Sequence, residues 1–175
     1  MAAHPEDFVI EDGVLKSVSK NYIKNNGGHI NIPNSVSRIG TSYVNKVFGN
    51  YPHLVESVTI PISVTHASLA TFLGCTNLKS LAIYNPEIEV EIFANEENVF
   101  FPSVEDVKDL EITITSIEHS EEKAQALKER LQIVLPNIEI HIDNPFDHFK
   151  GDPTFFSQPN TPEDSPPPSP STSPR

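Results

Sequence analysis

The chain has 175 residues, of which 37% are hydrophobic, and this length suits one folded domain with an extension. Its formal charge of −12 disfavours nucleic acid and anionic membrane surfaces as partners, because phosphate binding needs clustered lysine and arginine. One cysteine cannot form an internal disulfide, and no run of about 18 apolar residues is present that would cross a bilayer.

Residues 1–28 are predicted to form a hairpin that caps the amino end of the domain. The stretch "FVIEDGVLKS" places Phe8, Ile10, Val14 and Leu15 on either side of an Asp-Gly turn. The opening residues show no basic region followed by an apolar run, so no secretory signal is expected. The sequence therefore favours a cytoplasmic location, with delivery into a host cell or unconventional export to the surface as alternatives.

Further along the chain, several segments share the pattern apolar-x-x-apolar-x-apolar. Three segments fit the pattern directly: Leu78-Leu81-Ile83, Val107-Leu110-Ile112 and Leu135-Ile138-Ile140. The segment Leu54-Val58-Ile60 has one inserted residue, and Ile30-Ile32 is a partial copy. The closing isoleucines lie at positions 32, 60, 83, 112 and 140, at spacings of 28, 23, 29 and 28. This matches the period of about 20 to 29 residues in leucine-rich repeats, whose strands bury one face.

Other positions recur with the same spacing. Phe48, Phe72 and Phe101 each lie six residues before the first apolar residue of a segment. Ile-Pro is followed by Ser-Val at equal spacing in "IPNSV" and "IPISV". The sequence thus predicts an α/β-type solenoid over residues 29–143, with about four to five stacked repeats and one parallel sheet.

The stretches "GHINIPNSVSRIGTSYVNKVF" and "SVTIPISVTHASLATFLGCTNLKSLAI" resemble the BspA-type (Treponema pallidum-type) leucine-rich repeats of bacteria and protists. The resemblance covers residues 8–84, whereas residues 85–142 keep the strand period but lose Ile-Pro and Gly-Cys. It implies a curved solenoid with protein-binding or adhesive roles and no catalysis.

Residues 120–135 are predicted to form a helix that caps the carboxyl end. Ser120 is the expected N-cap, Glu121 and Glu122 suit the first turn, and apolar residues follow at helical spacing up to Pro136. A last strand is expected at residues 138–142, with Phe146 and Phe149 covering its open edge.

Residues 144–175 are predicted to be a disordered tail, because they contain nine prolines, five serines and no valine, isoleucine or leucine. Two P-x-x-P motifs can dock in SH3- or WW-type grooves. Ser-Pro pairs at Ser165, Ser169 and Ser173 are candidate phosphorylation sites, and Thr161 has the same context. An inert linker is the simpler interpretation of this segment.

The candidate binding residues are those that lie between the buried positions of the predicted strands and therefore point outward. They are Asn31, Thr59, Ala82, Tyr84, Asp109, Glu111, Glu139 and His141. Tyrosine is favoured at binding hot spots, and the face becomes acidic toward its carboxyl end. A protein partner with a basic surface fits this face best, although solvated strand residues with no partner would look the same.

No catalytic residue, metal site or cofactor is predicted. Cys75 has no evident base beside it and is expected to be a small buried residue of a repeat. His141, Asp143, Asp147 and His148 do not have a recognised metal-ligand spacing. Glu87, Glu89 and Glu91 alternate with apolar residues, which is typical of a solvated strand rather than an acid–base pair.

Together these features predict a non-catalytic protein–protein interaction module that presents the exposed face of a repeat sheet. Surface adhesion is the first alternative, and a secreted effector of a bacterium or protist that acts inside a host cell is the second. An enzyme is disfavoured because the chain has no room for a catalytic domain after residue 142.

Overall fold

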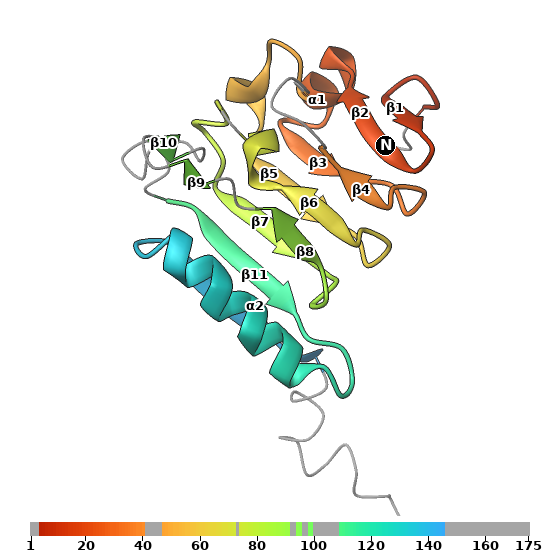
Figure 1. Ribbon diagram of the computed structural model, residues 1–175. Coiled ribbons are helices and arrows are strands. Elements are labelled where there is room, and N and C mark those ends of the chain that lie inside the picture. The colour runs from red at the N-terminus through yellow and green to blue at the C-terminus, as the bar shows by residue number, and fades with distance from the viewer. Residues whose placement is uncertain are drawn as a thin grey trace, which may run out of the picture.

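The computed structural model describes residues 4–40, 47–72, 74–91, 94–95, 98–99 and 109–145. These residues form an α/β fold with two mostly parallel five-stranded sheets and few helices (Figure 1). The predicted tail beyond residue 145, including Phe146 and Phe149, lies outside the described residues, as does Phe101. Among the residues described, no helix has the length and apolar character needed to cross a membrane.

The predicted amino-terminal hairpin is confirmed. It consists of β1 (Phe8–Glu11) and β2 (Val14–Val18), which pair antiparallel. Asp12 and Gly13 join them with φ values of 51° and 78°, the left-handed conformation that a two-residue hairpin turn requires. Phe8 and Leu15 turn inward and are buried, so the hairpin contributes side chains to the core.

The hairpin belongs to a sheet that the sequence did not predict. Its order is β1-β2-β4-β6-β8, with the short parallel strands β4 (Arg38–Ile39), β6 (His66–Ser68) and β8 (Glu89–Glu91) following the hairpin. We call it the hairpin sheet. Strands of two or three residues are too short to produce an alternation that can be recognised in a sequence.

The other sheet is the predicted parallel one, here called the long sheet. It comprises β3 (His29–Asn31), β5 (Ser57–Ile60), β7 (Ser80–Ile83), β11 (Glu111–Thr115) and β12 (Glu139–Asp143), each parallel to its neighbour. One buried row crosses it through Ile30, Val58, Leu81, Ile112 and Ile140. The predicted inward-facing positions of these strands are therefore correct.

The strand pairing differs from the alignment of the repeat segments at one place. Ile83 and Ile112 hold the same position in that alignment, but Ile83 lies opposite Ile114 and Leu81 opposite Ile112. The difference is two residues, so every side chain keeps its predicted face. Ile112 and Ile114 are both fully buried, and alternation alone cannot decide which of them pairs with Ile83.

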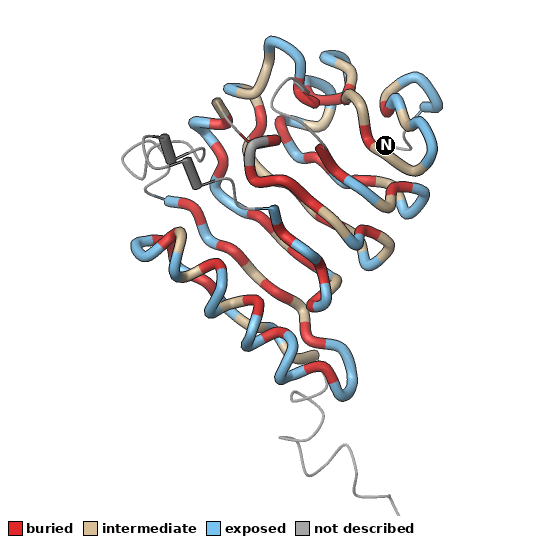
Figure 2. Tube along the Cα trace, in the orientation of Figure 1, coloured by how far each residue is buried: buried red, intermediate tan, exposed pale blue. Residues whose placement is uncertain are grey.

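The buried side chains of both sheets form one core cluster, which runs from Phe8 to Ile140 (Figure 2). Phe48 and Phe72 lie within it, with ring centroids 6.2 Å apart, as expected for side chains that fill the space behind the strands. The two sheets therefore share a single hydrophobic core.

Two α-helices are described. The short α1 (Lys20–Asn25), which was not predicted, begins after Ser19, whose Oγ accepts a hydrogen bond from the Tyr22 N–H at 3.0 Å. The predicted carboxyl-terminal helix is confirmed as α2 (Glu121–Val134), which packs against β11 and β12 at the end of the molecule opposite the hairpin (Figure 1). Ala124, Leu127 and Leu131 form its buried stripe.

Ser120 does not cap α2 with its side chain, contrary to expectation. Its Oγ donates to the Ile117 carbonyl oxygen at 2.6 Å and accepts from the Ile117 N–H at 2.8 Å. The hydroxyl therefore closes the turn that precedes the helix and is not available to the helix N–H groups.

The remaining elements are small. Two 3-10 helices, η1 (Pro52–Leu54) and η2 (Leu69–Phe72), precede β5 and β7 along the chain. β9 (Ala94–Asn95) and β10 (Asn98–Val99) form a separate two-stranded antiparallel sheet.

Candidate protein-binding face

The outward side of the long sheet carries two rows of side chains that pair across all five strands. The first row contains His29, Ser57, Ser80, Glu111 and Glu139, and the second contains Asn31, Thr59, Ala82, Thr113 and His141. Each is exposed or half-buried, because neighbouring strand residues point to opposite sides of the sheet. We call these two rows the exposed face.

The exposed face is uncharged at its amino end and carries short side chains in the middle. His29 and Ser57 are joined by a hydrogen bond of 2.7 Å between Nδ1 and Oγ. The central strands contribute short side chains, among them Thr59, Ser80 and Ala82. This part of the face offers hydroxyl groups and a shallow surface on which a partner can lie.

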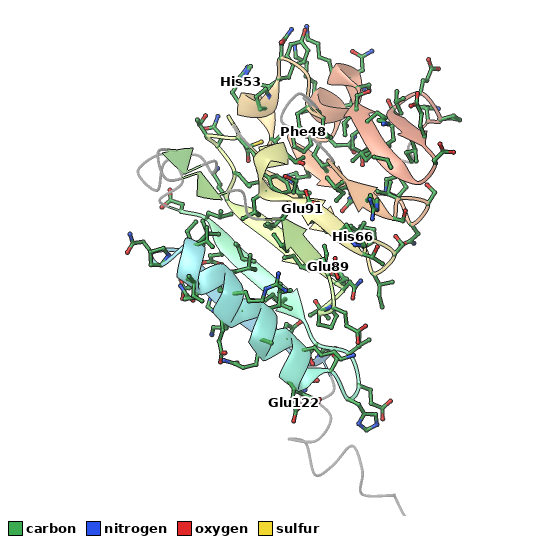
Figure 3. All side chains as sticks on the ribbon, viewed as in Figure 1. Phe48, His53, His66, Glu89, Glu91 and Glu122 are labelled. Carbon is green, nitrogen blue, oxygen red and sulfur yellow. The ribbon has the colours of Figure 1, made fainter. Side chains whose placement is uncertain are left out.

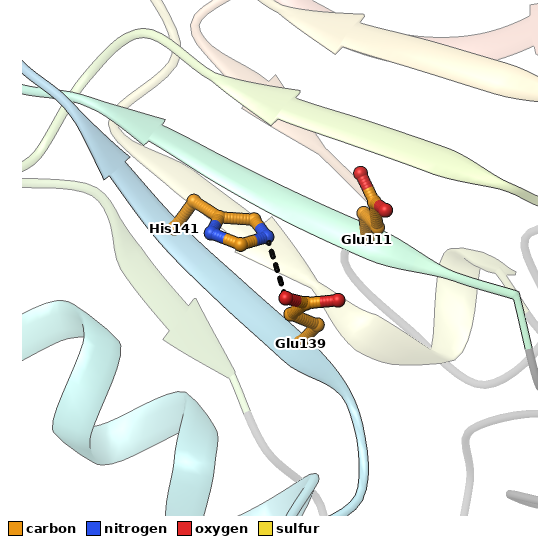
Figure 4. A group of neighbouring side chains, drawn as sticks. All are labelled: Glu111, Glu139 and His141. Atoms are coloured by element: carbon orange, nitrogen blue, oxygen red, sulfur yellow. Dashed lines mark ion pairs between the residues drawn. The ribbon is translucent and has the colours of Figure 1, made fainter.

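The carboxyl end of the exposed face is acidic. Glu111 lies opposite Glu139 on the neighbouring strand, and His141 follows Glu139 on the same side of β12 (Figure 4). The His141 Nε2 atom is 3.3 Å from Glu139 Oε1. The ion pair joins His141 to Glu139, and Glu111 adds a second carboxylate beside them, which leaves negative charge uncompensated on this patch.

The same three side chains offer one nitrogen and two carboxylate oxygens, all within 4.8 Å of one another. A divalent cation accepts such donors. All three side chains are exposed, and carboxylates commonly gather on a surface without an ion. The geometry alone therefore does not make this patch a metal centre.

The other predicted binding residues lie near the strand ends. Asp109 is exposed in the turn before β11. Tyr84 follows β7, where its N–H donates to the Ile60 carbonyl oxygen at 3.0 Å and its side chain is 44% exposed. Two exposed isoleucines hold similar places, Ile62 after β5 and Ile117 after β11, the strands on either side of β7. The sequence did not indicate that these apolar side chains would be exposed.

Cys75 is buried, as predicted. None of its surface is exposed, and burial raises the pKa of its thiol to about 12. At neutral pH the side chain is therefore a protonated thiol inside the core, whereas a nucleophile would have to be an accessible thiolate.

The acidic segment after β7 has the alternation that the sequence predicted. Glu89 and Glu91 are exposed on β8, while Ile88 and Val90 are buried. Glu89 Oε2 lies 2.9 Å from His66 Nε2 on the neighbouring strand β6 of the hairpin sheet (Figure 3). Glu87 forms an ion pair with Lys123 of α2. The carboxylates of Glu87, Glu89 and Glu91 all lie on a solvated surface, which argues against a catalytic acid–base pair.

A cavity of about 310 Å³ lies between the amino-terminal segment and α1. Its lining includes Asp7, whose carboxylate accepts hydrogen bonds from the His4 N–H at 2.7 Å and the Ser19 hydroxyl at 2.9 Å. The first of these bonds is the main cause of a lowered pKa at Asp7, and burial opposes it. Asp7 is thus used to tie the amino-terminal segment to the start of α1.

No protein-family model, curated protein or solved structure matches this chain.

Proposed function

We propose that the protein is a non-catalytic protein-interaction module that presents the exposed face of its long sheet to a protein partner. The observation that carries this proposal is the face itself, because no described element lies over its two outward rows. Its side chains are held by five paired strands, so binding would cost little ordering.

We also propose that the fold is a short leucine-rich repeat solenoid of the BspA type. Contacts that recur from one segment to the next support this. The Gly28 oxygen accepts from the Glu56 N–H, the Glu56 oxygen from the Lys79 N–H, and the Lys79 oxygen from the Glu111 N–H, all at 2.8 to 2.9 Å.

A second recurring contact lies on the hairpin-sheet side. The Ser63 hydroxyl donates to the Val36 carbonyl oxygen at 2.7 Å, and the Asn85 amide donates to the Val64 carbonyl oxygen at 2.8 Å. Val36 and Val64 hold the same place in the "IPNSV" and "IPISV" stretches. Repeated bonds between successive units are what stacking of repeats requires.

The uncompensated negative charge at Glu111 and Glu139 favours a partner with a basic surface. Opposite charges speed the association of two proteins, and like charges disfavour acidic competitors. Tyr84 supplies an aromatic side chain near the same strands, which suits it as an anchor. The absence of catalysis is proposed on the burial of Cys75 and the solvated setting of the glutamates on β8.

Affinity capture from native or host cytosol tests the proposal when the full chain is compared with face variants. The triple variant Tyr84→Ala, Glu111→Gln, Glu139→Gln should lose at least about tenfold in recovery of any specific partner, because it removes the anchor and the charge. A matched triple variant on the hairpin sheet, His66→Ala, Glu89→Gln, Glu91→Gln, should retain it.

Equal recovery by the two variants would contradict the exposed face as the binding site. A chain of residues 1–143 separates the remaining possibilities. If the partner is lost only with this shortened chain, the proline-rich segment recruits it, through its P-x-x-P motifs or through phosphorylation at Ser165, Ser169 or Ser173.

A further inference from the structure

β12 is the last strand of the long sheet, and its side away from β11 is not paired with any strand among the described residues. The Ser116 N–H donates to the Asp143 carbonyl oxygen at 2.8 Å, so the main-chain groups of Asp143 point toward the β11 side. In a parallel sheet this direction alternates along the strand. The groups of Glu139 and His141 therefore point toward β11, and those of Ile138, Ile140 and Ile142 point away.

Both outward main-chain groups of Ile138 are already occupied, and its N–H donates to the Leu135 carbonyl oxygen at 3.2 Å. The Ile138 carbonyl oxygen accepts a hydrogen bond of 3.1 Å from the Gln132 side chain of α2. Ile140 and Ile142 each present an N–H and a carbonyl oxygen on the same side, without a partner in the described part of the chain. These two N–H donors and two carbonyl acceptors, on alternate residues of β12, are the groups with which an added strand would form hydrogen bonds.

The side chains around this edge determine what kind of strand fits. Glu139, His141 and Asp143 are exposed along β12, and Glu111 lies beside Glu139. On the other side of the edge, Glu121 of α2 accepts a hydrogen bond of 3.4 Å from the Asn144 side chain. Lys128, a basic residue, lies two turns further along the same flank of α2. The acids outnumber it, so lysine or arginine side chains complement the edge.

Two other occupants are disfavoured by the residues themselves. A second copy could use Ile140 and Ile142 of both strands, without the occupied groups of Ile138, by pairing antiparallel about His141. That register would place Glu139 opposite Asp143 of the other copy, and like charges directly opposite are destabilising. The sequence after residue 145 contains many prolines, which have no N–H to donate to a strand ladder.

We propose that β12 accepts an extended basic segment of a partner protein as a sixth strand of the long sheet. Its main chain bonds to Ile140 and Ile142, and its lysine or arginine side chains alternate so that they lie beside Glu139 and Asp143. This inference rests on the proposed protein-binding function and names a second contact, at the edge of the sheet rather than on its exposed face.

The test uses the full chain and an acetylated, amidated nine-residue peptide that alternates lysine with threonine. Peptide binding is followed by NMR of the backbone amides and by their hydrogen exchange. Binding should slow exchange at Ile140 and Ile142 by at least about tenfold, because these amides become hydrogen-bonded. A peptide with glutamate in place of lysine should leave both amides unchanged.

Methylation of the peptide's own amides tests, with the protein left unchanged, whether the peptide forms main-chain hydrogen bonds to the edge of β12. Two peptides are compared, each N-methylated at alternate residues, so that only one of them loses the N–H groups that face β12. That peptide should bind at least about tenfold more weakly than its counterpart, because it cannot donate to the strand.

A matched pair of protein variants provides a second measurement. Ile142→Pro removes an N–H that points away from β11 and should weaken binding of the unmethylated peptide by at least about tenfold. Ile142→Val keeps the N–H and should bind as the unchanged chain does.

Four outcomes would overturn the proposal. They are no peptide binding at about 1 mM, equal binding of the two methylated peptides, slow exchange of the Ile140 and Ile142 amides before peptide is added, and concentration-dependent changes at these amides that reveal a second copy. Shifts confined to residues such as Thr59 and Ala82 would reject the edge while supporting the exposed face. Glu139 belongs to both contacts, so the capture experiment is read separately through Tyr84→Ala alone, since Tyr84 follows β7, two strands away from β12.

Discussion

At the scale of single residues, Gly28 shows how closely neighbouring segments approach. Its φ is +81°, and a Cβ atom added there would lie 2.2 Å from the Leu54 carbonyl oxygen. Its own carbonyl oxygen accepts from the Glu56 and Ser57 N–H groups at 2.9 and 3.2 Å. A side chain at this position would therefore separate β3 from β5 at the start of the long sheet.

We expect Gly28→Ala to lower the free energy of unfolding by more than about 3 kcal/mol, because backbone strain and overpacking act together. Gly49 provides the control, since it also has positive φ, of 59°, but the nearest atom to an added Cβ is 3.9 Å away. Gly49→Ala should cost about 1 to 2 kcal/mol from the backbone conformation alone. Urea unfolding measures both, and equal losses would show that the close contact at Gly28 is unimportant.

At this scale, one part of the candidate site follows from the sequence and another part does not. Glu139 and His141 are two residues apart on one strand, so alternation predicts that they share a side of the sheet. Whether Glu111 lies opposite Glu139 or elsewhere depends on how β11 pairs with its neighbours. The exposure of Ile62 and Ile117 was not predicted either, because isolated apolar residues in a turn resemble core residues in a sequence.

At the scale of elements, α2 is the clearest case of a segment defined by its own periodicity. Ala124, Leu127 and Leu131 fall on one stripe and are buried, whereas Ile133 points away and is 81% exposed. Helical spacing was sufficient to predict the element and its core-facing residues. The role of Ser120 could not be predicted in the same way, because its hydroxyl has two competing sets of main-chain partners.

The stripe on α2 makes a quantitative prediction. Leu127→Ala and Leu131→Ala should each lower the free energy of unfolding by about 2 to 5 kcal/mol, because each leaves a cavity against β11 and β12. Ile133→Ala should change it by less than about 0.5 kcal/mol. Chemical denaturation monitored by circular dichroism compares them, and a comparable loss for Ile133→Ala would mean that this side chain is covered in solution.

At the scale of the whole molecule, both sheets contribute to one core. Leu15, Ile39 and Ala67 of the hairpin sheet belong to the same cluster as the buried rows of the long sheet and α2. Removal of any one layer would expose apolar surface on the next. The described part of the chain is therefore expected to unfold as a unit.

Thermal and urea unfolding test this expectation with two probes. Tyrosine fluorescence reports on the amino-terminal half of the sequence, which contains all four tyrosines, Tyr22, Tyr43, Tyr51 and Tyr84, and far-ultraviolet circular dichroism is dominated by α2. The two transitions should have the same midpoint. Separate midpoints would show that the α2 end and the hairpin end are independent units, as a weakly coupled repeat array allows.

The sequence by itself determined the features that depend on local periodicity: the hairpin at Asp12-Gly13, the inward faces of the long-sheet strands and the helix α2. Local patterns specify which side of an element is apolar, because side chains alternate in strands and return every 3.6 residues in helices. Only the tertiary structure decided the two-residue shift at β11, the existence of the hairpin sheet and the meeting of Glu111 with Glu139 and His141. Those depend on which distant segments pair, and an even shift of register leaves the same alternation in the sequence.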